Sequence, residues 1–347
     1  MQGAVGRAII PGVQTSDAPV VDPWRLEILV VSGGTRSSSE RSSISRDVAA
    51  GLLLRLCPRG YVERSAFEAL TPEQQHLVRL RAVTATSPRP VVVSHWSAAV
   101  VHGLPVLRSR AAAVHVTVPE DDDRHRTGVV THHFLVEDEE VVLIGDLLVT
   151  GVGRTVVDVA GASSFEEGVM AADAALLAGL PRETLEAAAD LAGERRASRR
   201  IEDVVAFAHP GGESAAESRF RASAMRLGLE VPVLQRPVRV RDGEVFLDGW
   251  FRSADAGVEV DGEQKYLDAA MAPQGPARAV IREKRREDDV RLEVRALVRI
   301  GWVQSGSPAA LRVVLARVGV RPTNPRTAFA AYCEQARLAR PRRRSRT

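Results

Sequence analysis

The stretch GVEVDGEQKY, residues 257–266, decides how this chain is interpreted. Val258 and Val260 alternate with Glu259 and Asp261, and this period of two is typical of a β-strand, whose successive side chains point to opposite faces. Two carboxylates therefore share one face of the predicted strand. Carboxylates this close repel each other, so we expect a nearby cation to offset the repulsion.

The residues before this strand predict its partner. A four-residue turn over 252–255 would bring the chain back beside the preceding strand, with Phe251 opposite Ala256. Counting outwards from that pair sets Asp248 directly opposite Glu259. The prediction depends on register, because a slip of one residue moves every side chain to the other face.

Asp248, Glu259 and Asp261 then lie on one face of a two-strand unit. Carboxylate oxygens are hard ligands that suit Mg²⁺ or Mn²⁺, so these three residues are the predicted metal ligands. The alternative is that Glu259 and Asp261 form the solvated face of an edge strand, which needs no metal.

A helix and two lysines complete the predicted site. Residues 213–227 form a predicted helix in which Glu217 lies in line with the face that should be buried. We expect Glu217 to approach the carboxylates as a further catalytic residue. A bound magnesium ion would polarise a phosphodiester and prepare the attacking water. Lys265 or Lys284 would stabilise the negative charge that develops on the phosphate.

Charge is distributed unevenly along the chain. The formal net charge is only +3, but the segment REKRRED, residues 282–288, concentrates basic side chains within little more than one helical turn. Clustered arginines suit phosphate recognition, although a GC-rich genome also favours arginine over lysine. The predicted contacts to nucleic acid are Arg282, Lys284, Arg285 and Arg286.

Composition excludes several classes of protein. With 347 residues and 45% hydrophobic content, the chain is long enough for two modest domains. No run of about 18 apolar residues predicts a membrane span, and the first 45 residues lack the pattern of a secretory signal. Cys57 and Cys333 are too far apart for a zinc-ligand spacing. We therefore expect a cytoplasmic protein.

The histidines give no comparable signal. His95 and His102 fall on one predicted helix, where packed or exposed histidines are the usual case. His132 and His133 are neighbours on a predicted strand and so point to opposite faces, which argues against a shared metal ion.

The predicted fold class is a mixed α/β chain. A mostly helical N-terminal half would contain one small hairpin, made by the alternating segments 113–120 and 128–136. The C-terminal half would be an α/β domain with a mixed central sheet that includes strands 245–250 and 257–261. The predicted boundaries give a flexible tail at 1–45, a first domain at 46–208, a second at 209–320 and a basic tail at 321–347.

The second domain resembles a known superfamily. It resembles the PD-(D/E)XK nucleases, in particular the branch similar to very-short-patch-repair endonucleases. The resemblance is carried by four features in this order: Glu217, Asp248, the E-x-D-G sequence at 259–262 and EKRREDD at 283–289. The resemblance covers about residues 211–320. It implies a restriction-endonuclease-like fold and magnesium-dependent cleavage of DNA. The superfamily has a lysine where this chain has Asp261, which leaves the catalytic lysine unassigned.

The first domain resembles a different family. It looks like the AbiEi-type antitoxin-like region that is often joined to such a nuclease domain. Four stretches carry this resemblance: RGYVERSAFEALTPEQQHLVRLRAV, SHWSAAVVHGLP, VHVTVP and GRTVVDVA. This resemblance spans roughly residues 50–205 and implies a cognate toxin or another protein as a partner. The function that we expect is a DNA endonuclease or nicking enzyme of defence or repair. The alternative is a non-catalytic DNA-binding regulator that keeps the nuclease fold.

Overall fold

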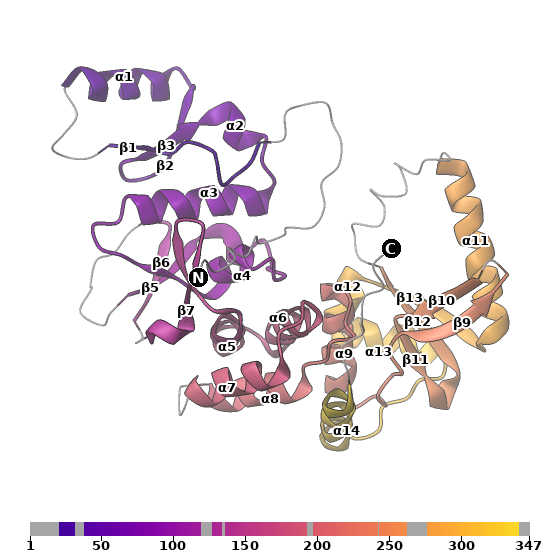
Figure 1. Cartoon of the computed structure of the whole chain (residues 1–347). Helices are drawn as coiled ribbons and strands as arrows, with labels where there is room; N and C mark the ends of the chain where they lie inside the picture. The colour runs from indigo at the N-terminus through magenta and orange to yellow at the C-terminus, as the bar shows by residue number, and fades with distance from the viewer. Residues whose placement is uncertain are drawn as a thin grey trace, which may run out of the picture. The chain divides into compact units, whose positions relative to one another are not determined.

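The chain has a mixed α/β fold, as the sequence predicts (Figure 1). The computed structural model describes residues 21–31, 38–118, 127–133, 136–192, 197–241, 243–261 and 276–339, without the side chains of 38, 276–284, 325 and 326. Contacts within the chain divide it into Met1–Val159, called unit 1, and Ala160–Thr347, called unit 2. This division falls within a helix, whereas the sequence places a boundary between 208 and 209.

Unit 1 contains a five-stranded sheet in the order β6-β5-β4-β8-β7. The predicted hairpin of β5 and β6 is wrong, because these two strands pair in parallel. Alternation identifies a strand but not the direction of its partner. The connection of ten residues, 119–128, can span about 33 Å, enough for the chain to return to the end where β5 began. The strands are β4 (Val92–Val93), β5 (Val114–Val118), β6 (Val129–His133), β7 (Val141–Ile144) and β8 (Leu147–Thr150).

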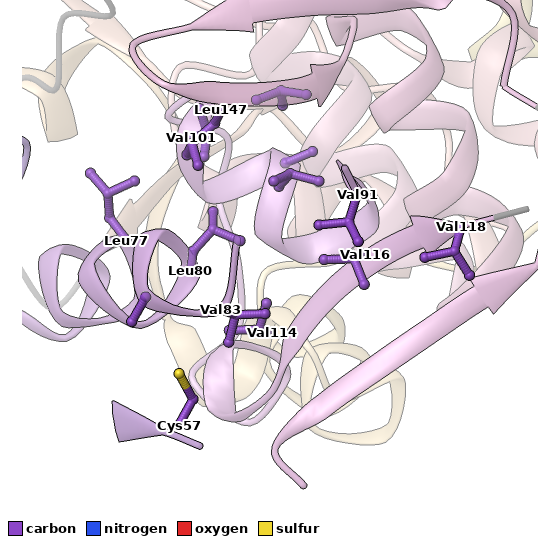
Figure 2. Close-up of a cluster of buried hydrophobic side chains, with 14 residues drawn as sticks. Cys57, Leu77, Leu80, Val83, Val91, Val101, Val114, Val116, Val118 and Leu147 are labelled. Carbon is purple, nitrogen blue, oxygen red and sulfur yellow. The ribbon is translucent and has the colours of Figure 1, made fainter. Parts of the chain in front are cut away.

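Two helices pack on this sheet and form the core that Figure 2 shows. Helix α3 (Pro72–Ala85) begins at Thr71, whose side chain accepts a hydrogen bond from the backbone N–H of Gln74 in a capping box. Helix α4 (His95–Val101) follows β4 directly. Side chains from α3, α4 and the strands interdigitate in this core, among them Leu77, Leu80, Val83, Val101, Val114, Val116 and Leu147.

A second, three-stranded sheet lies at the start of unit 1, in the order β1-β3-β2. Its strand β1 lies within the region predicted as a flexible tail, 1–45, and helix α1 overlaps the end of that region. Unit 1 therefore holds more strand than the single hairpin predicted. The elements are β1 (Leu29–Val30), α1 (Ser38–Ala49), β2 (Leu53–Cys57), β3 (Gly60–Glu63), α2 (Arg64–Glu68), the short 3₁₀ helices η1 (Arg110–Ala112) and η2 (Asp138–Glu140), and α5 (Val152–Ala162).

Unit 2 begins with a layer of helices in which α6 packs against α8 and α9, and α14 packs against α8 and α9. Part of the predicted basic tail is thus an ordered helix, and Tyr332 of α14 is fully buried and donates a hydrogen bond to the Glu230 carbonyl. The helices are α6 (Phe165–Leu177), α7 (Arg182–Ala192), α8 (Ser198–Phe207), α9 (Ala215–Arg226) and α14 (Pro325–Leu338).

The rest of unit 2 is built on a mixed sheet in the order β11-β12-β13. Strands β11 and β12 are antiparallel, while β12 and β13 are parallel and are connected through α11. Strands β9 and β10 form a separate antiparallel ladder, so the strand predicted over 245–250 is interrupted at Asp248. The elements are β9 (Arg236–Val240), β10 (Gly243–Leu247), β11 (Gly249–Phe251), η3 (Arg252–Ala254), β12 (Ala256–Asp261), α11 (Pro276–Glu293), β13 (Ala296–Gly301), α12 (Trp302–Ser305) and α13 (Pro308–Arg317).

Helices cover both faces of this sheet. Phe220 of α9 meets Phe251 of β11 edge to face. Val290 and Val294 of α11 pack with Leu297 of β13, whose side chain points to the opposite face of the sheet. Both faces of β12 are therefore removed from water. Among the residues that the structure describes, no helix has both the length and the apolar character that crossing a bilayer requires.

Candidate functional site

Strand β12, which carries the opening motif, is the central strand of its sheet. It lies between β11 and β13, and every residue from Ala256 to Val260 is buried. Glu259 is only 9% exposed. The alternative of a solvated edge strand is therefore wrong, and the Glu259 carboxylate needs a partner within the protein, because a buried charge is unstable without one.

The predicted register of β11 and β12 is confirmed. Phe251 lies opposite Ala256 and Gly249 lies opposite Val258, where the ladder ends. The pair of Asp248 with Glu259 that the count predicts lies one position beyond this ladder. The short helix η3 makes the turn between the two strands. The Oδ2 atom of Asp248 accepts a hydrogen bond of 2.7 Å from the backbone N–H of Val260. This bond holds the Asp248 carboxylate against β12.

Glu217 lies in the first turn of α9, and its backbone N–H donates to the side chain of the N-cap residue Ser214. The Ser214 hydroxyl donates to Oε1 of Glu217 at 2.7 Å, and the Glu213 N–H donates to Oε2 at 3.0 Å. Burial, and then the charge of the Asp248 carboxylate, raises the pKa of Glu217 to about 7. The helix carboxyl is thus close enough to Asp248 for the two to influence each other's charge, as the sequence predicts.

Two arginines bind the Glu259 carboxylate. Nη2 of Arg286, on α11, lies 3.3 Å from Oε1, and Nε of Arg299, on β13, lies 3.1 Å from Oε2. Arg299 occupies the position of β13 directly opposite Glu259. Its second ion pair, of 3.5 Å, is with Glu287 of α11. The buried charge of Glu259 is therefore offset by guanidinium groups.

Asp261 lies beside the same arginine. Burial alone would lower the pKa of the Arg299 guanidinium, but Glu259 and then the more distant Glu287 and Asp261 raise it above its ordinary value. The predicted residues consequently fall into two neighbouring groups. One contains Glu217 and Asp248, and the other contains Glu259, Asp261 and the two arginines.

The carboxylates do not fit a metal ion in this arrangement. In the described part of the chain, no group of three or more His, Cys, Asp or Glu side chains is placed so that it could hold one. Each oxygen of Glu259 contacts an arginine, and each oxygen of Glu217 accepts a hydrogen bond. The donor chemistry suits magnesium, but the oxygen atoms are engaged by other partners.

The predicted basic residues are only partly placed by the structure. Lys265 lies outside the described residues, and Arg282 and Lys284 are in α11 but their side chains are not described. Arg285 is exposed. Arg286 lies beside the carboxylates, as predicted, and binds Glu259.

Sequence reasoning missed Arg299. In the segment ALVRIG, residues 296–301, it is a charged residue within an otherwise apolar strand, and that is the signal that could have identified it. Its partner could not have been identified, because the parallel pairing of β12 and β13 joins segments separated by α11.

Unit 1 contains a histidine cluster that the sequence did not predict. The rings of His95 and His132 stack with centroids 3.4 Å apart, and Nδ1 of His115 lies 3.0 Å from Nε2 of His132. Burial lowers the pKa of both His115 and His132 to about 4, with a further contribution from neighbouring cationic groups. Both rings are therefore neutral at pH 7 and pack as aromatic groups.

A scan against models of protein families, a search of curated proteins and a search of solved structures each find no match for this chain. The two family resemblances accordingly remain expectations drawn from short motifs. The functional argument rests on the residues of the site and on the order of the elements that position them.

Proposed function

We propose that residues 209–320 form a nucleic-acid endonuclease or nicking domain, with DNA as the expected substrate, acting in defence or repair in the cytoplasm. One observation carries the proposal. Glu217 from α9 and Asp248, just before β11, lie close enough to affect each other's charge, although they are far apart in the sequence, and the Asp248 carboxylate is bound to the N–H of Val260, the neighbour of Glu259 on β12. Chemistry-bearing residues that meet in this way on separate elements are typical of an active site.

The order of the elements also supports this function. Helix α9 precedes the antiparallel strands β9 to β12, and α11 then leads to β13, which is parallel to β12. This order gives the mixed sheet that we expect for this domain from the sequence, and this supports the proposal. Fold alone does not establish an activity, so the residues of the site carry the argument.

The side chains of the site suit phosphodiester chemistry. A carboxyl group with a pKa of about 7, such as that of Glu217, can exchange a proton near neutral pH. The guanidinium groups of Arg286 and Arg299 match the geometry of a phosphate, since each presents several N–H donors in one plane. The proposed requirement for Mg²⁺ or Mn²⁺ rests on the chemistry of the carboxylate ligands, since both oxygens of Glu259 are bound by these arginines.

A nicking assay tests the proposed activity. Supercoiled and mismatched DNA is incubated with the full chain and Mg²⁺ or Mn²⁺, with a chelator as the control. We expect Asp248→Asn to reduce cleavage to the level of the chelator control while DNA binding is kept, since the substitution removes one negative charge but little volume. Glu244→Gln, at an exposed position on β10, is the matched control and should cleave like the wild type.

The second candidate is a non-catalytic DNA-binding regulator, with a cognate toxin or other protein as the partner of residues 46–208. The double ion pair of Glu259 favours it, because a carboxylate held by two arginines contributes structure without a metal ion. Binding of DNA in the presence of chelator, with no cleavage by the wild-type chain under any metal condition, would establish this second function and exclude the first.

A further inference from the structure

The C-terminal part of unit 2 contains a stretch whose charges are all positive. Residues 294–333 include six arginines but no Asp, Glu or Lys, although the whole chain has a formal net charge of only +3. Arg312 and Arg317 occupy exposed positions of helix α13, and Arg321 is exposed just beyond the end of that helix. We call these three residues the α13 arginines.

The α13 arginines differ from other exposed arginines of unit 2 in their partners. Arg226 and Arg337 have side chains that are 55% and 73% exposed, and each forms an ion pair with a carboxylate, of 2.5 and 2.8 Å. Within the part of the chain that the structure describes, the side chains of the α13 arginines make no ion pair and no hydrogen bond. Their N–H donors are therefore turned to solvent.

The elements packed against α13 do not supply the missing negative charge. They are α9, α12 and β13, whose residues include a single carboxylate, that of the buried Glu217. Another cation lies at the end of the helix, where Nη2 of Arg295 donates a hydrogen bond of 2.8 Å to the Val318 carbonyl. The helix dipole places only about half a negative charge at this end. The net charge of the surface is consequently positive.

The apolar face of α13 is not available to a partner. Leu311 and Leu315 are fully buried within the protein, and Val313 is the large apolar side chain of this helix that remains exposed. A helix that binds a membrane surface needs a broad apolar face to bury there. The exposed face of α13 instead offers guanidinium groups, whose planar sets of donors match the oxygens of a phosphate.

We propose that the α13 arginines, together with Arg295, bind the phosphate backbone of the nucleic acid on which unit 2 acts. This inference rests on the proposed function, because it names the surface that holds the substrate. Helix α13 packs against α9 and β13, the elements that carry Glu217 and Arg299. Contacts to phosphate position a nucleic acid without reading its sequence. The surface would thus hold the substrate beside the candidate site.

The test is a measurement of DNA affinity at several salt concentrations. Binding of the full chain to a short fluorescent DNA duplex is followed by anisotropy, with chelator present so that metal-dependent cleavage cannot occur. Each phosphate contact contributes about 0.9 to the slope of log affinity against log salt concentration. The variant with Arg312→Gln and Arg317→Gln should bind more weakly than the wild type, with a slope smaller by about 2. A duplex of unrelated sequence should show the same change.

Two control variants separate this effect from a change in total charge or in folding. The variant with Arg226→Gln and Arg337→Gln removes the same charge at exposed but paired positions and should keep the wild-type slope. The variant with Arg312→Lys and Arg317→Lys keeps the charge of α13 and should also keep the slope. Thermal unfolding followed by circular dichroism checks that each variant is folded. Polyglutamate in place of DNA tests an acidic protein as the partner, and the wild type should bind it more weakly than DNA.

An unchanged slope in the glutamine variant of α13, or an equal change in the variant of Arg226 and Arg337, would overturn the inference. Absence of DNA binding by the wild type would overturn it as well. Binding of polyglutamate as tight as that of DNA, and lost in the glutamine variant of α13, would assign the surface to an acidic protein instead.

None of these results depends on cleavage, so the inference and the proposed function can fail separately. If the slope falls as expected but the wild type cuts no nucleic acid, the endonuclease function fails while the role of the α13 arginines stands. If the wild type cuts DNA and the slope does not change, only the inference fails.

Discussion

Two regions of unit 2 each hold a buried carboxylate against arginine, and they do so in different ways. In the helical layer, Asp173 of α6 meets Arg221 of α9 at 2.6 Å, and their side chains are 0% and 1% exposed. In the sheet, the Glu259 side chain is 11% exposed, and the side chains of its two arginines are more than one-third exposed.

The surroundings of the two sites explain the difference. Arg221 also donates to the Phe207 carbonyl and lies over the Phe207 ring, while Asp173 accepts a hydrogen bond from the His209 N–H. Every partner of this pair belongs to the protein core, so no solute can take the place of either charge. The arginines of Glu259 reach solvent. The first pair is therefore enclosed by the core, whereas the arginine side of the second is open to solvent.

The largest effect expected from this comparison is the loss of Arg221. Arg221→Met leaves the Asp173 charge buried without its partner and should lower the free energy of unfolding by about 3–5 kcal/mol. Urea denaturation followed by circular dichroism measures this. Arg337→Met, which removes an exposed pair with Glu334, is the control and should change stability by about 0–1 kcal/mol.

A double variant makes the same prediction stricter. Adding Asp173→Asn to Arg221→Met removes the unpaired charge and should recover part of the lost stability, because the cost arises mainly from the isolated charge. If the double variant is less stable than Arg221→Met alone, the pair is not the reason for the loss.

A smaller effect concerns Glu217, whose carboxyl is neutralised by a proton rather than by an arginine. Its pKa is about 7 in the folded chain, against 4.5 for the free side chain, so the folded state binds more protons between these values. The stabilising contribution is fully present below pH 4.5 and is lost as the pH rises towards 7. We expect the wild type to lose about 3 kcal/mol relative to Glu217→Gln across this window.

This difference is obtained by measuring the free energy of unfolding of both proteins at several pH values from 4.5 to 8. Taking the difference cancels groups that the two proteins share, including His115 and His132. Those histidines act in the opposite direction, because their lowered pKa makes the chain less stable as the pH falls from 6.5 towards 4. A difference that does not vary with pH would contradict the raised pKa of Glu217.

The smallest effect is expected for Glu259. Glu259→Gln removes a charge whose partners can be solvated, so the loss of stability should be on the order of 1 kcal/mol, well below that for Arg221→Met. Urea denaturation under the same conditions allows the comparison. A loss as large as that of Arg221→Met would mean that the arginines of Glu259 are as much a part of the core as Arg221 is.

Much of unit 2 could be predicted from local pattern. The alternation around Glu259 predicts a strand, the turn at 252–255 sets the register that pairs Phe251 with Ala256, and Ser214 with Glu217 marks the start of α9. These features depend on the geometry of neighbouring residues in the chain. The proximity of Glu217 to Asp248, which raises the pKa of Glu217, depends instead on how α9 packs in unit 2.

Other features were decided only by the tertiary structure. Three examples are the direction of pairing between β5 and β6, the central position of β12 and the pairing of Glu259 with Arg299. Each depends on which segments lie side by side, and the periodicity of a segment does not indicate its partner. The period of a strand fixes which side chains share a face, because it follows from backbone geometry. Which cation meets a buried carboxylate depends instead on which strand lies alongside, and that is set by packing of the whole unit.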